Sequence, residues 1–189
     1  MTESLRYTVE RKIGDVEIRN YPNFLIASVD GMTDDDAFRI LFGYISGNNK
    51  SREQVAMTVP VISGKREREE IPMTTPVIST SRSFSFVMPP RYTQDTLPEA
   101  SDERVRIIEI RSRRIAVLSF KGRTKEDSVR RHEAELLRIL DMGGVKVNGE
   151  SFLMRYNGPF TPGFIRHNEI AVEVEALTVV TESACWSIA

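Results

Sequence analysis

The chain has 189 residues, a length typical of one domain that can bury a sizeable apolar core. Its 26 lysines and arginines nearly balance its 27 acidic residues, and the net charge of -1 excludes a general attraction to nucleic-acid phosphates or anionic lipids. No run of residues approaches the roughly 18 apolar positions of a membrane span, and residues 1–11 lack the apolar stretch of a secretion signal. We therefore expect a cytoplasmic protein without nucleic-acid or membrane partners, in which the single cysteine, Cys185, forms no internal disulfide.

Strands are predicted where β-branched and alternating residues are bounded by Gly, Pro or Asn. Three are expected before any helix, at 7–12, 16–21 and 24–29. Later strands are expected at 84–88, 105–110, 115–120, 145–147, 152–156 and 169–174. Sheet is therefore the main framework of the predicted fold.

A repeated segment adds two more predicted strands. VAMTVPVIS at 55–63 returns as IPMTTPVIS at 71–79, and the charged stretch 64–70 separates the two copies. We expect an antiparallel hairpin with 64–70 as its loop. Pro60 and Pro76 lack the N–H that a central ladder needs, so each should lie at a sheet edge or at a bulge.

The first predicted helix covers 34–46, with Thr33 as its N-cap, Asp36 three residues later and Gly47 placed to end it. At 100° per residue its apolar side chains span an arc of about 200°, whereas packing on one sheet face needs little more than about 100°. The remaining surface therefore meets something else. Two candidates are open at this point. One is more protein, either the loops around 159–164 or a second copy of the chain, and the other is a flat apolar ligand.

The second predicted helix covers 125–142, with Thr124 and Asp127 as its start signal and Gly143-Gly144 as its end. Its apolar arc of about 160° is ordinary for an amphipathic helix lying on a sheet. The order of strands and helices indicates an α+β fold with two similar β-rich halves, each carrying one helix.

Three residues of the first helix suit a planar, anionic ligand. Gly43 lets a flat ring approach the backbone, Phe42 supports the ring, and the Arg39 guanidinium is able to bind a carboxylate through two hydrogen bonds. These are the features that an anionic porphyrin needs.

Side chains that commonly ligate heme iron are few. His132 borders the apolar face of the second helix, where a partly buried structural role is favoured, and His167 precedes the last strand, where a hydrogen bond to the backbone is at least as typical as ligation. Met57 and Met73 hold equivalent places in the repeat, where a thioether either faces a porphyrin or fills the core. No histidine pair has the helical spacing of a metal site, so no independent metal is expected.

Signatures of catalysis are missing from the sequence. It has no nucleophile elbow, no phosphate-binding glycine loop, no dinucleotide fingerprint and no thioredoxin-type cysteine pair. We therefore expect a protein that is not an enzyme.

Several short motifs occur in a characteristic order along the chain. They are NYP at 20–22, FxxLFxYIxGxN at 38–49, the two MTxPV units, FxG at 120–122, and NGPFTP followed by FIRHNEI at 157–170. Together they resemble the SOUL/heme-binding protein family over about 7–174. We expect one domain over 1–189 with that core and a C-terminal tail at 175–189.

The resemblance implies a distorted antiparallel β-barrel built from two β-rich repeats, with two helices packed outside, and reversible binding of heme and related porphyrins. It places the porphyrin along the first helix and the loop before the last strand, with a helix arginine and a loop lysine as partners of the propionates. Arg39 stands at the arginine position, whereas Thr161 stands where the lysine is expected. The missing lysine leaves three outcomes open: weaker binding, a different tetrapyrrole, or compensation by Arg166.

Our leading hypothesis is a heme or porphyrin carrier or buffer that needs no fixed axial ligand. Arg39 binds a propionate, and the other expected contacts are apolar: Phe42, Gly43 and Met57 against the macrocycle, with Phe160 and Phe164 closing the site. A sensor of another apolar small molecule is the first alternative, because the paired-repeat barrel is also similar to bacterial effector-binding domains. A protein-interaction module that uses the apolar face of the first helix, with self-association as one form, is the second.

Overall fold

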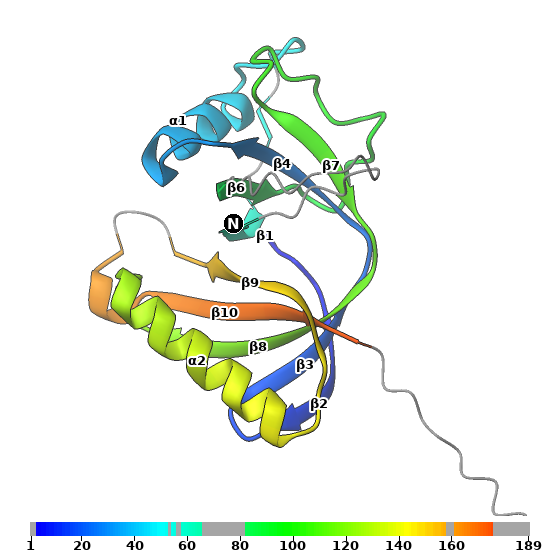
Figure 1. Cartoon of the computed structure of the whole chain (residues 1–189). Helices are drawn as coiled ribbons and strands as arrows, with labels where there is room; N and C mark the ends of the chain where they lie inside the picture. Colours follow the sequence, from blue (N-terminus) through cyan, green and yellow to red (C-terminus); the bar gives the residue numbers. More distant parts are fainter. Residues whose placement is uncertain (1–2, 53, 56–57, 66–81, 158–160, 176–189) are drawn as a thin grey trace, which may run out of the picture.

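The computed structural model describes residues 3–52, 54–55, 58–65, 82–157 and 161–175. In this part of the chain, the strands form one curled sheet with two α-helices against it (Figure 1). The strands are β1 (Glu3–Ser4), β2 (Thr8–Ile13), β3 (Val16–Tyr21), β4 (Phe24–Asp30), β5 (Thr58–Lys65), β6 (Arg82–Val87), β7 (Arg106–Ile110), β8 (Arg113–Lys121), β9 (Val147–Arg155) and β10 (His167–Val174).

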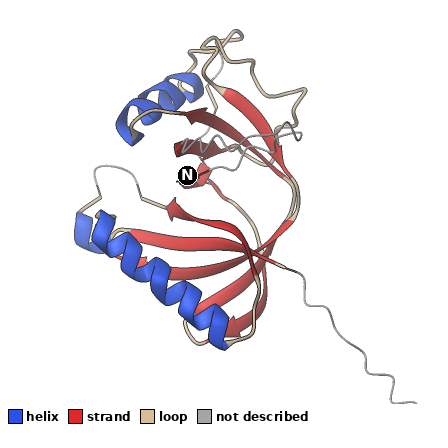
Figure 2. Cartoon of the chain, viewed as in Figure 1, coloured by secondary structure: helices blue, strands red, loops and turns tan. Residues whose placement is uncertain are grey.

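The sheet runs in the order β2-β3-β8-β10-β9-β5-β6-β4-β7, and all of these neighbours are antiparallel. The short β1 adds a parallel pair to β5. The sheet curls round like part of a barrel, and both helices lie against it (Figure 2). The predicted α+β fold, a distorted antiparallel barrel with two helices, is confirmed.

Helix α1 (Asp34–Ile45) begins and ends where the local signals predict. The Thr33 hydroxyl accepts a hydrogen bond from the Asp36 N–H at 3.3 Å, and Gly47 adopts a φ of 105°, which favours glycine. Helix α2 (Glu126–Met142) has Lys125 at its N-cap, without a side-chain cap bond. The predicted cap at Thr124 is therefore wrong, and the acidic Glu126 and Asp127 in the first turn complement the helix dipole instead.

Alternation along the strands gives the sheet two apolar faces. The outer face packs against the helices, for example through Leu25, Ala27 and Val29 against α1 and through Ala116 and Leu118 against α2. The inner face carries separate clusters that share Leu5, Phe24 and Ile62. Each half therefore has its own core under its helix, and the two halves join along the inside of the curl.

The two halves do not divide the chain at one point. Strands β4 to β7 and α1 make one half, which we call the α1 half, whereas β2, β3, β8, β9, β10 and α2 make the α2 half. Strand β3 pairs with β8 rather than with β4, its successor along the chain. The prediction of two β-rich halves with one helix each is confirmed, but β2 and β3, which precede α1 in the chain, belong with the second helix.

The repeated segment pairs differently from the predicted hairpin. Strand β5 lies between β6 and β9, so both of its edges are occupied over Val61–Gly64. The predicted partner at 71–79 and its Pro76 lie outside the described residues. Pro60 falls where the register of β5 and β6 shifts between Thr58 and Val61, so the predicted irregularity at Pro60 is confirmed.

Candidate functional site

Helix α1 leaves part of its wide apolar arc exposed. Leu41, Tyr44 and Ile45 are buried, but the Phe42 side chain is 49% exposed. The Phe42 ring stacks on Phe38 with their centroids 5.7 Å apart, at an interplanar angle of 12°. The described part of the chain thus leaves half of an aromatic side chain in solvent beside a packed one.

A groove of about 230 Å³ runs along the neighbouring side of α1. Arg39 and Gly43 line it from the helix, together with Ile40, Tyr44, Asn48, Ala100, Asp102 and Val105. The Tyr44 hydroxyl donates a hydrogen bond to the Pro98 carbonyl oxygen at 2.6 Å, and burial raises the pKa of Tyr44 to about 12. This bond holds the far wall of the groove against the helix.

The charges of the groove favour an anion near Arg39. The Arg39 side chain is 78% exposed, and its contact with Asp36 is a loose ion pair of 3.6 Å. Asp102 receives two hydrogen bonds from the Arg104 guanidinium, at 2.9 and 2.7 Å, and another from its backbone N–H. These bonds lower the pKa of Asp102 to about 2, so the carboxylate is already neutralised by its own partner.

The protein itself does not require glycine at position 43. A Cβ atom built there would meet only the Asn48 side chain, at 3.9 Å, which is ordinary van der Waals contact. Because an alanine would have room, the small residue leaves an open approach to the helix backbone.

The loop before the last strand lies in the α2 half. Phe164 sits on a short 3-10 helix, η1 (Gly163–Ile165), and is 79% exposed. Arg166 Nε donates to the Thr161 carbonyl oxygen at 2.9 Å, so the arginine lies over the position where the lysine was expected. Arg155, which ends β9, binds Asp34 at the start of α1 at 2.8 Å. This bond ties the strand that leads into the loop to the helix of the other half.

The structure therefore brings together three of the six predicted site residues. Arg39, Phe42 and Gly43 share one exposed side of α1, whereas Phe164 does not line the groove. Met57 and Phe160 lie outside the described residues. These site assignments stay predictions.

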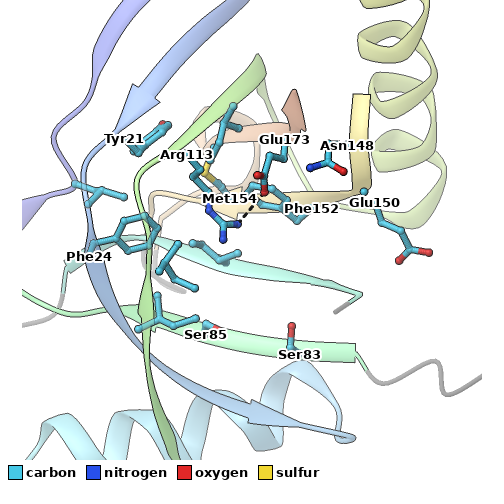
Figure 3. A pocket seen from close by; sticks show the side chains of 16 residues that line it. Tyr21, Phe24, Ser83, Ser85, Arg113, Asn148, Glu150, Phe152, Met154 and Glu173 are labelled. Carbon is cyan, nitrogen blue, oxygen red and sulfur yellow. Dashed lines mark ion pairs between the residues drawn. The ribbon is translucent and has the colours of Figure 1, made fainter. Parts of the chain in front are cut away.

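A second hollow, which we call the inner cavity, lies inside the curl of the sheet and measures about 300 Å³ (Figure 3). Most of its wall is apolar, and its lining includes Leu5, Tyr21, Phe24, Ile26, Ile62, Ile110, Ile115, Phe152 and Met154. Arg113 and Glu173 enter it as an ion pair of 3.4 Å. Strand patterns do not predict this cavity, because a polar residue that points into it alternates with apolar neighbours just as a solvent-exposed polar residue does.

Beside it on the inner face lies a buried network around Glu169. The Arg19 guanidinium binds both carboxylate oxygens at 2.9 and 3.0 Å, and the hydroxyls of Tyr156 and Ser119 donate at 2.5 and 2.9 Å. Burial alone would raise the pKa of Glu169, but the bonds from Arg19, Tyr156 and Ser119 outweigh it and lower that pKa. The glutamate is thus a buried anion whose two oxygens both accept hydrogen bonds, and no motif in the sequence predicts this network.

Both histidines have structural contacts. His132 Nδ1 lies 2.7 Å from the Ser128 carbonyl oxygen, and its ring stacks on Phe120 at 4.1 Å, as the partly buried structural role predicted. The backbone N–H of His167 donates to the Asn157 side-chain oxygen, Oδ1, at 2.6 Å. Among the described residues, no cluster of three or more histidine, cysteine or acidic side chains suits a metal ion, and no helix is long and apolar enough to cross a bilayer.

Several solved structures share the fold at low sequence identity. The C-terminal domain of EcmrR is 12% identical over 90% of this chain and 99% of that domain, with a TM-score of 0.61. An uncharacterized conserved protein from Listeria innocua is 14% identical over 85% of this chain and 92% of its own, with a TM-score of 0.60. A hydrolase from the same organism is 16% identical over 89% of this chain and 94% of its own, with a TM-score of 0.58. At these identities the likeness shows the fold alone.

Sequence comparison gives a narrower result. No protein of curated function matches the chain. The profile of the SOUL heme-binding protein family matches residues 2–173, which is nearly the whole sequence. The motifs, the curled sheet with its two helices and this match lead to one conclusion: the chain belongs to the SOUL heme-binding protein family.

Proposed function

We propose that the protein is a non-enzymatic carrier or buffer of heme or a related tetrapyrrole, bound on the exposed side of α1. The observation that carries the proposal is the exposed aromatic and cationic surface of this helix. Phe42 is half exposed, Gly43 leaves the backbone open, and Arg39 has only a loose partner. Membership of a heme-binding family supports the ligand class.

The residues present suit such a ligand. A porphyrin ring would lie against Phe42 and Gly43, and Arg39 would bind a propionate, with Arg166 as a second cation from the loop. Desolvation of apolar area, at about 25 cal/mol per Å² before the costs of association, would supply most of the affinity. Met57, Phe160 and Phe164 stay in the proposal as further apolar contacts. Bound heme would bring its own iron chemistry, for which no protein ligand is assigned here.

A hemin titration followed in the Soret band tests this proposal. We expect saturable one-to-one binding that Arg39→Ala weakens by roughly three- to tenfold, the loss of one partly exposed charge-assisted hydrogen bond. Arg138→Ala on the exposed face of α2 is the matched control and should leave the affinity unchanged. An affinity of Arg39→Ala within twofold of the unmodified protein would show that the assigned site is wrong.

The exposure of Phe42, Phe164 and Ile165 also favours one alternative, a second copy of the chain packed on these residues. Sedimentation velocity over a range of concentrations distinguishes the two. Dimers that Phe42→Ser dissociates, and that hemin does not compete with, would favour an interaction module over a carrier.

A further inference from the structure

The inner cavity is separate from the groove on α1. Strand β4 lies between them, with Leu25 and Ala27 packed in the core under α1 and Phe24 and Ile26 turned into the curl. The sheet therefore stands between the two hollows. A ligand in one would not touch a ligand in the other.

The polar end of the cavity is incompletely bonded. A guanidinium carries five N–H donors, and the Arg113 side chain, which is 31% exposed, makes no side-chain hydrogen bond to a residue that the structure describes. Its Nε is buried without an acceptor among those residues, and its one ion pair, to Glu173, has a length of 3.4 Å. Buried donors in proteins are nearly always paired, so the buried Nε–H has capacity for an acceptor inside the cavity, whereas water reaches the exposed part of the guanidinium. Figure 3 shows the guanidinium reaching in from β8 toward Glu173 on β10.

Charge at this end favours a neutral guest. Arg113 and Glu173 together carry no net charge. A carboxylate bound to Arg113 would face Glu173, and a cation would face Arg113. An uncharged molecule that offers one acceptor oxygen meets neither penalty, and it leaves the ion pair intact.

We propose that the inner cavity is a second ligand site, for a small uncharged and mostly apolar molecule whose carbonyl or ether oxygen accepts a hydrogen bond from Arg113. Phe24, Ile62 and Phe152 contact its apolar body. The cavity volume of about 300 Å³ lies at the lower end of the range for ligand pockets and limits the guest to roughly two fused rings. This site does not depend on the proposed tetrapyrrole site.

The test uses prodan, a neutral naphthyl ketone whose fluorescence reports both apolar surroundings and hydrogen bonding. We expect saturable one-to-one binding with a blue-shifted emission. Ile62→Trp, which fills the cavity from β5, should weaken binding more than tenfold, and Phe152→Trp gives a second filling variant. Arg113→Met keeps the length of the side chain and should weaken binding roughly three- to tenfold, the loss of about one hydrogen bond.

Controls separate this site from the groove and from misfolding. Circular dichroism and thermal unfolding must show that each variant is folded. Arg39→Ala should leave prodan affinity unchanged, and Ile62→Trp should leave hemin affinity unchanged. The anionic probe 1-anilinonaphthalene-8-sulfonate should bind the cavity at least tenfold more weakly than prodan. Its binding to the cavity is measured as the part of its fluorescence that Ile62→Trp removes.

Three outcomes would overturn the proposal. Prodan binding that does not saturate would mean that water alone fills the cavity. Binding that is insensitive to both tryptophan variants would place the probe elsewhere. Competition by hemin together with sensitivity to Arg39→Ala would assign the probe to the groove.

Discussion

At the scale of single residues, the Arg19–Glu169 pair is the most constrained contact of the inner face. Their side chains are 5% and 3% exposed, so both charges have lost nearly all their water. A buried pair of this kind adds little net stability, yet each partner needs the other, because an unpaired buried charge is costly. The pair therefore matters more for what its loss costs than for what its presence contributes.

We predict that Glu169→Gln lowers the free energy of unfolding by about 1 to 3 kcal/mol, because the buried Arg19 charge then keeps only Glu17, a more exposed carboxylate 2.8 Å away, as its counter-charge. The double variant Arg19→Met with Glu169→Leu should recover most of that loss. Urea unfolding curves measure both. Equal losses in the single and double variants would mean that hydrogen bonds from Tyr156 and Ser119, rather than the charge, dominate.

Gly43 allows stability and ligand binding to be separated. Gly43→Ala should raise the free energy of unfolding by up to about 1 kcal/mol, because alanine is the better helix former and its Cβ meets only Asn48 at 3.9 Å. The same change should weaken hemin binding, because the methyl group stands where the ring approaches. A more stable variant with unchanged hemin affinity would show that the macrocycle does not lie over this residue.

At the scale of elements, local signals predicted the helices within one residue at each end, because caps depend on neighbours in sequence. Strand partners were less predictable. The segment 55–63 does contain a strand, but β6 and β9 pair with it, and that choice depends on packing across the whole sheet. The inner cavity was missed for a related reason. Arg113 and Glu173 alternate with apolar residues as solvated residues do, and only the curl turns them inward.

The start of α1 joins the groove to the rest of the molecule, since Thr33 caps it and Asp34 binds Arg155. Thr33→Ala should lower the free energy of unfolding by about 1 kcal/mol, whereas Thr33→Ser should keep the cap bond to Asp36 and most of that energy. Thermal or urea unfolding measures the difference. A serine variant as unstable as the alanine variant would show that the methyl group, not the hydroxyl, matters.

At the scale of the whole molecule, buried and hydrogen-bonded carboxylates set the response to acid. The pKa of Glu169 lies below its ordinary value of 4.5 in the folded protein, and that of Asp102 is about 2. A carboxyl whose folded pKa is lowered stabilises the fold above its unfolded pKa and loses that contribution as the pH falls through the folded value. Stability should therefore decline from about pH 4.5 downward.

The same linkage gives a test of the buried pair. Between pH 7 and 3 the free energy of unfolding should fall less steeply in Glu169→Gln than in the unmodified protein, because the amide does not titrate. Urea unfolding at several pH values measures both slopes. Parallel slopes would mean that other carboxyls carry the acid response.

The order of strands has a consequence for how the protein is made. The β2–β3 hairpin leaves the ribosome before the α1 half, yet Val16 pairs with Leu118, which follows the entire α1 half in sequence. At roughly 5 to 20 residues per second, the hairpin waits on the order of 5 to 20 s for β8, while strands β4 to β7 and α1 have all emerged. The α1 half is therefore the part that is able to fold first, and a fragment that ends before residue 113 should contain a packed α1 half beside a β2–β3 hairpin that has no β8 to pair with.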